Sequence, residues 1–295
     1  MADSELPQTE RRNDALRGLD VLSTGDLVRA IAGDQRVAVD AVNAAGDPIA
    51  RVVDAVSARL SNGGRLHYIG AGTSGRLGVL DASEMPPTFG TPPELVCAHI
   101  AGGDRALRTP AEGAEDDGDA GEREIAGHVY ADDAVIGISA SGGAAYVTRA
   151  IARARALGAF TAAITNSDPS PLGDAADIKI FLDTGPEAVT GSTRLKAGTS
   201  QKLALNTIST AVMVRLGKVY ENLMVDVVAT NEKLKRRASR LVQTLADVSD
   251  DEAQMLLRGA GGNVKIAVVM SRRGVDAETA ISLLERERGF LRNLL

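Results

Sequence analysis

Apolar residues along this chain recur in short runs separated by stretches with helical spacing. Five runs predict β-strands, at residues 65–69, 95–100, 134–139, 160–165 and 178–182. Several are unbroken rather than alternating, which is typical of strands that are covered on both faces. Helical patterns lie between most of them, the clearest over residues 144–157. We therefore predict an α/β fold with a parallel five-stranded sheet, whose ligands bind beyond the carboxyl ends of the strands.

The segments on either side of this pattern are expected to be mostly helical. Residues 1–20 are polar and predict an extended arm, whereas residues 23–62 show helical periodicity. After the last strand we expect one helix that starts within residues 185–202 and another over residues 219–246. The chain then changes character, and three short amphipathic helices are predicted at 250–258, 263–271 and 276–286. These observations predict a large domain over residues 1–246 and a small three-helix domain over residues 247–295.

Composition narrows the class of protein. The chain has 295 residues, a net charge of −6, 3% aromatic residues and no tryptophan, which argues against nucleic-acid binding. It has no apolar run of 18 residues and no apolar leader, so we expect neither a membrane span nor a signal peptide. The single Cys97 indicates a reduced, cytoplasmic setting. Because the three histidines are scattered along the sequence, we expect no dedicated zinc site.

The first candidate for chemistry is the turn that follows the first predicted strand. It has glycines at 70, 72 and 75, and Thr73 and Ser74 add hydroxyl groups at the start of a helix. Such a turn suits a phosphate, because helix N-termini present free N–H groups and a partial positive charge. A tight connection without a ligand is the simpler alternative. The spacing of the glycines also fits a dinucleotide-binding fingerprint. That fingerprint requires an acid at the end of the next strand to hold a ribose, but here residues 101–103 separate the strand from Asp104.

A second glycine-hydroxyl turn, at residues 138–143, also follows a strand and precedes a helix. Two such turns at one edge of a sheet favour a phosphate pocket over two unrelated helix caps. The hydroxyl-rich and cation-rich residues 185–202 could complete an anion site or be an ordinary helix start. Residues 102–126 are the most acidic segment, and in it Glu112 and Glu115 share a helical face. Glu84 precedes Pro86, where we expect the helix to end.

Five stretches together resemble the sugar isomerase (SIS) domain, a family that binds phosphosugars. Within that family the chain is similar to the N-acetylmuramic acid 6-phosphate etherases. The stretches are residues 70–90, 100–116, 138–147, 189–206 and 217–234. The resemblance implies a cytoplasmic homodimeric lyase of peptidoglycan recycling, which needs no metal and no redox cofactor. It implies cleavage of the D-lactyl ether of N-acetylmuramate 6-phosphate, which gives N-acetylglucosamine 6-phosphate and D-lactate.

The resemblance also implies roles for particular residues. Glu84 matches the proton donor and Glu115 matches the second catalytic acid, which we assign as the base at C2. Five hydroxyl residues match those that hold the phosphate, namely Thr73, Ser74, Ser139, Ser141 and Ser192. The proton donor must be protonated when substrate binds. We therefore expect Glu84 to be buried, because burial raises the pKa of a carboxyl group.

The chain departs from the family pattern beside the second turn. Residues 141–146 read Ser-Gly-Gly-Ala-Ala-Tyr, where the family commonly has Ser-Gly-Arg-Thr-Pro-Tyr. The missing arginine and threonine predict that phosphate or lactate contacts there are weaker, or come from Lys196, Arg194 or a partner chain.

Two other functions fit the same scaffold. An aldose–ketose isomerase would also move the C2 proton but would release no lactate. A non-catalytic sugar-phosphate sensor, like the glucokinase regulatory protein, would need neither acid nor base. The presence of both Glu84 and Glu115 therefore favours the enzyme.

Overall fold

The computed structural model describes residues 6–227 and 231–295. The chain forms two compact units, one from residues Met1–Ala82 with Glu94–Ser209 and one from Ser83–Pro93 with Thr210–Leu295. The division into 1–246 and 247–295 remains a sequence-based prediction. None of the described helices is long and apolar enough to cross a bilayer.

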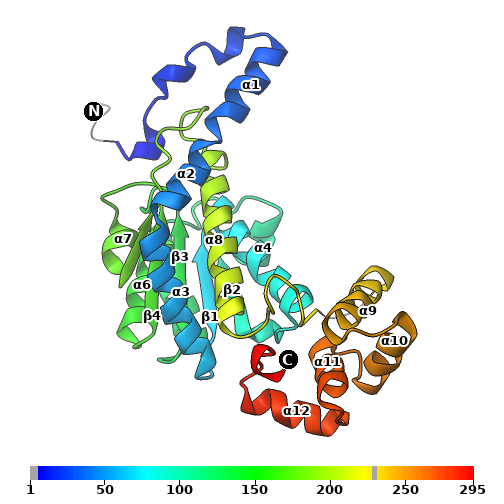
Figure 1. The fold of residues 1–295 in the computed structure, drawn as a ribbon. Helices are drawn as coiled ribbons and strands as arrows, with labels where there is room; N and C mark the ends of the chain where they lie inside the picture. The colour runs from blue at the N-terminus through cyan, green and yellow to red at the C-terminus, as the bar shows by residue number, and fades with distance from the viewer. Residues whose placement is uncertain (1–5, 228–230) are drawn as a thin grey trace. The chain divides into compact units, whose positions relative to one another are not determined.

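The first unit is built on a five-stranded sheet in which all neighbouring strands are parallel (Figure 1). Its strand order is β2-β1-β3-β4-β5. The strands are β1 Leu66–Gly70, β2 Val96–Ile100, β3 Ala134–Ser139, β4 Phe160–Thr165 and β5 Ile178–Phe181. Each lies within one residue of its predicted bounds. Every residue of β1 and β3 is buried, which explains their unbroken apolar runs and confirms the predicted fold.

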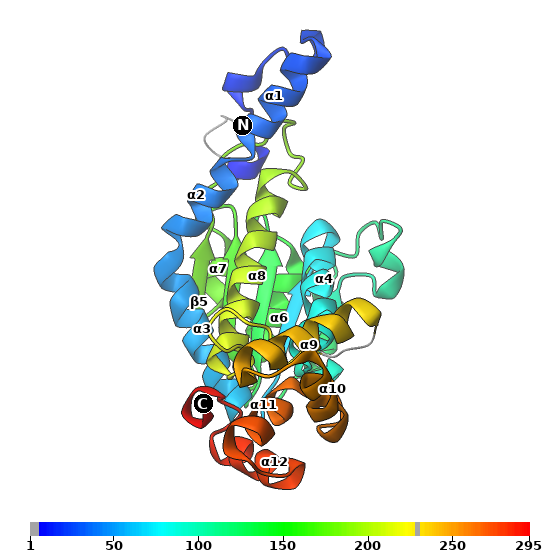
Figure 2. The ribbon, with the colours of Figure 1, turned by 45° about the vertical axis from the view of Figure 1, so that its right-hand side comes forward.

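Helices cover both faces of this sheet. The helices that lie entirely in the first unit are α1 Thr24–Asp34, α2 Val37–Ala44, α3 Gly46–Ser61, α5 Gly118–His128, α6 Ala145–Ala156 and α7 Pro171–Ala175. On one face, Ile125 of α5 and Ile151 of α6 pack with Ile69 and Val135. Figures 1 and 2 show α3 together with α8 (Lys196–Arg215) over the other face. The loops that carry the predicted site lie at the carboxyl ends of the strands.

Two sequence predictions for the first half of the chain are wrong. Residues 8–21 form three short 3₁₀ helices rather than an extended arm, and residues 1–5 of that arm lie outside the described part. One cause is Asn13, whose side chain accepts a hydrogen bond from the N–H of Ala15 and so favours a turn. In addition, α4 (Gly72–Phe89) continues through Pro86 and Pro87. Proline fits helical φ, and the helix needs only one more turn, which closes with the N–H of Gly90 donating to Pro86.

The second unit contains the helices α9 Glu232–Ala246, α10 Asp250–Gly259, α11 Val264–Arg273 and α12 Ala277–Arg286. The last three agree with their predicted bounds to within two residues, and Ser249 with Glu252 forms a capping box. The helix predicted over 219–246 begins only at Glu232, after the Asn231 cap. Tyr220 and Leu223 form a tight bridge before it, and residues 228–230 lie outside the described part.

Candidate functional site

The first turn is shaped by contact between its own glycines. A Cβ on Gly70 would lie 2.6 Å from the Gly75 nitrogen, and one on Gly75 would lie 2.7 Å from the Gly70 oxygen. Gly72 has φ +53°, in the left-handed region that glycine tolerates. The start of α4 therefore crosses directly over the end of β1, and any side chain at residues 70 or 75 would push the two apart.

The two hydroxyl-bearing side chains of this turn lie against the first turns of α8. Ser74 is buried, and its Oγ donates to Oε1 of Gln201 at 2.8 Å. Thr73 is half-buried, with its methyl group beside Gly198. The hydroxyl of Ser74 is therefore already engaged in a protein hydrogen bond.

That bond belongs to a buried network centred on Asn166. Gln201 donates through Nε2 to Oδ1 of Asn166 at 2.9 Å. The Nδ2 of Asn166 in turn lies within hydrogen-bond distance of three oxygens, on Leu182 (3.1 Å), Thr184 (3.2 Å) and Ser200 (2.9 Å). Asn166 and Ser200 are fully buried. The network therefore fixes the first turn, the end of β4 and the first turns of α8 relative to one another. Sequence reasoning missed it, because its members are far apart in the chain.

The second turn is held by bonds within itself. Oγ of Ser139 accepts from the Gly142 N–H, and Oγ of Ser141 accepts from the Gly143 N–H, both at 3.2 Å. Each serine can still direct its own hydroxyl hydrogen to another acceptor. Because β1 and β3 are parallel neighbours, this turn opens at the same sheet edge as the first, as predicted.

A carboxylate from the segment before α8 caps the start of that helix. Glu187 is fully buried and accepts from the backbone N–H groups of Lys196 (3.1 Å) and Ala197 (2.9 Å). Burial raises the pKa of Glu187, and the two N–H groups oppose that rise. The next two N–H groups of α8 donate to Thr193 and Leu195. The first four backbone N–H groups of α8 therefore all have acceptors within the chain. Ser192 is half-buried in the preceding turn.

Lys196 does not replace the arginine that is missing beside the second turn. Its ammonium group is buried and lies 2.8 Å from the carboxylate of Asp34. Arg194 is exposed in the same segment. The cation expected from Lys196 is therefore committed to an ion pair within the chain.

The structure brings Glu115 close to the second turn. The Glu115 carbonyl accepts from the N–H of Tyr146 at 3.0 Å, in the first turn of α6. Its side chain is exposed. The backbone of the acidic loop is thereby held against the first turn of α6, which follows Ser141 in the chain.

Glu84 is placed differently. It lies on α4, ten residues after Ser74, which corresponds to about 15 Å along the helix axis. The helix therefore does not bring Glu84 to the first turn. Its side chain is exposed in the single chain, so the expected burial is wrong. Glu84 belongs to the second unit and Glu115 to the first, so neither unit alone contains the predicted pair.

One turn before Glu84, an unpredicted carboxylate anchors α4. Asp81 is 2% exposed and accepts from the Tyr68 hydroxyl (2.9 Å), the Asn206 amide (2.6 Å) and the Ser209 hydroxyl (3.1 Å). Burial raises the pKa of Asp81 and also that of Tyr68. These bonds join α4 to β1 and α8, so Asp81 fixes the orientation of the helix that carries Glu84.

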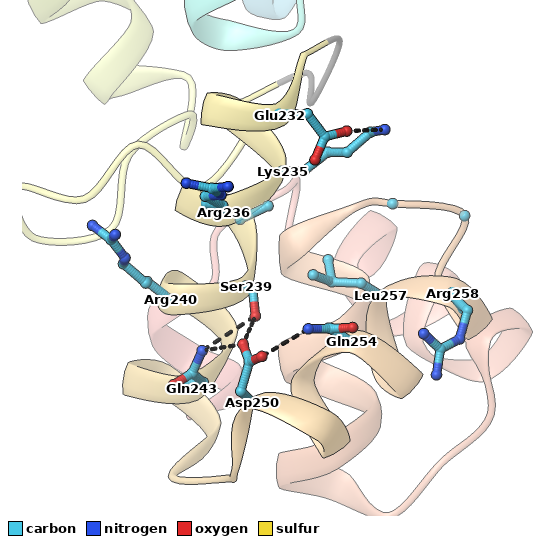
Figure 3. A pocket seen from close by; sticks show the side chains of 13 residues that line it. Glu232, Lys235, Arg236, Ser239, Arg240, Gln243, Asp250, Gln254, Leu257 and Arg258 are labelled. Carbon is cyan, nitrogen blue, oxygen red and sulfur yellow. Dashed lines mark hydrogen bonds and ion pairs between the residues drawn. The ribbon is translucent and has the colours of Figure 1, made fainter.

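The second unit has a hollow of its own, of about 850 Å³, between α9 and α10. Figure 3 shows Asp250 between α9 and α10, where its carboxylate accepts from Ser239 (2.6 Å), Gln243 (2.7 Å) and Gln254 (2.7 Å). Arg240 of α9 also lines it. Its described lining includes none of the seven residues predicted for the site, so it is a separate feature of the molecule.

Comparison with known proteins supports the fold of the sheet and its flanking helices. The profile of the glucokinase regulatory protein N-terminal SIS domain matches residues 48–155, and the SIS domain profile matches residues 112–211. A phosphoheptose isomerase from Francisella tularensis superimposes with a TM-score of 0.54 at 19% identity, over 65% of this chain and 100% of that chain. That likeness concerns the fold of the sheet and its flanking helices.

Relatives of higher identity match almost the whole chain. The N-acetylmuramic acid 6-phosphate etherase of Deinococcus radiodurans is 50% identical over 98% of this chain and 95% of its own length. The enzymes of the same name from Serratia proteamaculans and Geobacillus thermodenitrificans are 49% and 47% identical, each over 97% of this chain and at least 97% of their own. This similarity extends through both compact units, and the chain therefore belongs to the N-acetylmuramic acid 6-phosphate etherase family.

Proposed function

We propose that this protein is a carbon–oxygen lyase that cleaves the D-lactyl ether of N-acetylmuramate 6-phosphate with water, in peptidoglycan recycling. The products are N-acetylglucosamine 6-phosphate and D-lactate. The observation that carries the proposal is near 50% identity to named etherases along the whole chain, with Glu84 and Glu115 both present. We further propose that it acts in the cytoplasm as a homodimer, without a metal, a redox cofactor, nucleic acid or a membrane as partner in the reaction.

The chemistry requires two carboxyl groups in opposite protonation states. In the open-chain sugar the ether at C3 lies β to the aldehyde, so loss of the C2 proton allows the C3–O bond to break. Glu115 takes that proton, and Glu84 protonates the oxygen of the departing lactate. Water then adds to C3 of the unsaturated aldehyde while a proton returns to C2, which balances the reaction.

The hydroxyl groups position the phosphate for this reaction. We assign direct contact to Ser139 and Ser141, because each accepts from its own turn and can donate to the ligand. Thr73, Ser74 and Ser192 complete the proposed set of phosphate-binding residues. For Ser74, the bond to Gln201 supports a role in which it fixes the turn.

The test is D-lactate release from N-acetylmuramate 6-phosphate by the purified wild type, Glu84→Gln and Glu115→Gln. Loss of either group should lower kcat by about 10²- to 10⁴-fold, the usual contribution of general acid–base catalysis. Glu112→Gln is the matched control, since Glu112 is an exposed acid in the same loop, and it should keep wild-type activity. Of the two variants, only Glu84→Gln should still exchange the C2 proton with solvent.

A sugar-phosphate sensor is the second candidate, because the profile of the glucokinase regulatory protein SIS domain matches residues 48–155. A sensor would bind the phosphosugar tightly and release no lactate. That result with wild-type protein would overturn the etherase. Exchange of the C2 proton without lactate release would instead support an isomerase.

A further inference from the structure

The three histidines that are scattered in sequence lie together at the β2 edge of the sheet. His67 pairs in register with Cys97, so His99 lies two residues further along β2 on the same face. Nδ1 of His67 is 3.0 Å from Nε2 of His99. On the other side of its ring, Nδ1 of His99 is 2.7 Å from Oε1 of Glu124, on α5. His128 follows one helical turn later, with Nδ1 3.6 Å from the same oxygen.

Glu124, His99 and His67 form a row of polar side chains that ends at a second carboxylate, that of Asp133. Nε2 of His67 is 3.4 Å from Oδ2 of Asp133, which also pairs with Arg65 at 2.9 Å. The side chain of His67 is 1% exposed, and its Nε2 has no hydrogen-bond partner within the described residues. The fold thus places two imidazoles in line between two carboxylates.

With both imidazoles neutral, this row contains fewer N–H groups than close approaches between its polar atoms. It has three gaps between acceptors, from Asp133 to His67, from His67 to His99, and from His99 to Glu124. Each gap needs one hydrogen, but two neutral imidazoles bring only two N–H groups. A cation beside His99 and Glu124 would supply what is missing. Both N–H groups could then point inward along the row, from His99 to His67 and from His67 to Asp133.

We propose that His99, Glu124 and His128 bind one divalent transition-metal ion of the Zn²⁺ type. The ligand atoms of these three residues all lie within 4.8 Å of one another. Two imidazoles and one carboxylate suit zinc, whereas Mg²⁺ and Ca²⁺ prefer oxygen ligands alone. Zinc ligands about 2.0–2.2 Å from the ion must lie roughly 3.4 Å apart in a tetrahedron. Binding therefore requires the side chains to rotate, and Nδ1 of His128 must leave the backbone carbonyl of Glu124, which is 2.8 Å away, or the ring must present Nε2.

Two further features fit a metal site. The side chains of Glu124 and His128 are 38% and 55% exposed, which gives the ion a path from solvent and leaves room for water as a fourth ligand. Behind the ligands, His67 would accept from the second nitrogen of His99. Such outer hydrogen bonds orient metal-binding histidines and raise their basicity.

The ion would act as a clip around the loop that carries Glu115. His99 lies on β2, which leads into that loop, and Glu124 and His128 lie on α5, which leads out of it. Cross-linking residues 99 and 124 removes chain entropy from the unfolded state and restrains the loop ends. The site is structural and independent of the proposed lyase chemistry, so its test uses metal binding rather than activity.

The experiment is calorimetric titration of ZnCl₂ into the chelator-treated full-length protein, without an added histidine tag. We expect one Zn²⁺ per chain and a higher Tm with zinc, since a ligand that binds only the folded state stabilises it. Co²⁺ in place of zinc should give the visible absorption of a site of low coordination number. His128→Ala and Glu124→Gln should each weaken zinc binding by at least about 10- to 100-fold, the loss that outer-ligand changes alone cause.

The control is Glu122→Gln, which removes the same charge from α5 but pairs with Arg149 on another face. It should bind zinc like the wild type. Because His128 is exposed, its removal should leave the circular dichroism unchanged. Absence of saturable one-to-one binding by the wild type would overturn the proposal and indicate that a proton completes the row. Wild-type affinity in both ligand variants would also overturn it and would place the ion elsewhere.

Discussion

The two turns at the carboxyl ends of β1 and β3 are alike in sequence but are held together differently. In the first, Gly70 and Gly75 touch backbone to backbone and Ser74 is tied to Gln201. In the second, Ser139 and Ser141 accept only from N–H groups of their own turn among the described bonds. Similar composition thus serves two tasks. The first turn fixes α4 against the sheet, whereas in the proposed function the second presents hydroxyl donors to the phosphate.

The largest effect that tests this comparison comes from a methyl group in the first turn. In Gly70→Ala the new Cβ would meet the Gly75 nitrogen at 2.6 Å, where only backbone movement can relieve the clash. We expect a loss of about 3 kcal/mol or more in the free energy of unfolding. Chemical denaturation monitored by circular dichroism measures it.

Gly72→Ala is the matched control, because its Cβ would meet nothing within 4 Å and only its φ of +53° is unfavourable. That variant should lose about 1–2 kcal/mol, the cost of a left-handed alanine. Equal losses in the two variants would show that conformation rather than close contact shapes the turn, and would remove the contrast with the second turn.

An intermediate effect should separate the two serines. Ser74→Ala leaves the buried oxygen of Gln201 without its donor, which should cost about 1–3 kcal/mol of stability. Ser141→Ala removes a partly exposed hydroxyl, so stability should change by less than about 0.5 kcal/mol. Its KM for the phosphosugar should instead rise by about 10-fold, as expected for one hydrogen bond to a charged group. Thermal unfolding and steady-state kinetics on both variants check the split.

Reversal of that pattern would contradict the division of tasks. If Ser74→Ala raised KM with unchanged stability, the first turn would be the main phosphate contact. The bond to Gln201 would then have to break when the ligand binds.

Local patterns predicted the sheet because each strand is a run of apolar residues, and such a run can be recognised without knowledge of the distant segments that cover it. The same reasoning located both turns, since glycine and hydroxyl residues between a strand and a helix are typical of such turns. It failed where distant segments decide. Asn166 meets Gln201 only after the sheet and α8 have packed. The end of α4 was predicted wrongly for a local reason, because proline fits helical φ and the helix continues for only one turn.

The predicted carboxylates show the same limit. Sequence similarity proposes Glu84 and Glu115, and the hydrogen bond from the Tyr146 N–H holds the backbone of Glu115 at the start of α6. Exposure of Glu84 could not be predicted from its neighbours in sequence, because Asp81, one turn earlier, is the acid that the fold buries. A helix presents a different residue to each side, and only packing decides which side is covered.

The smallest expected effect is a gain in affinity for the phosphosugar from a substitution in the second turn. Gly143 is exposed, its φ lies outside the left-handed region, and a Cβ there would meet Ser141 Oγ at an ordinary 3.5 Å. Gly143→Arg restores the arginine common in the family and adds a cation beside Ser141. Because the new guanidinium would be exposed, we expect the free energy of substrate binding to improve by about 0.2–1 kcal/mol, which lowers KM by about 1.4- to 5-fold.

This gain should depend on charge and therefore on salt. Gly143→Ala adds the Cβ without the guanidinium and should leave KM unchanged. The advantage of Gly143→Arg should shrink as ionic strength rises, because exposed charges are screened within about 10 Å at 0.1 M salt. Kinetics at low and high salt decide the point. An equal KM in the arginine and alanine variants would mean that the second turn binds its ligand through neutral hydroxyl donors alone, which would make its contrast with the first turn complete.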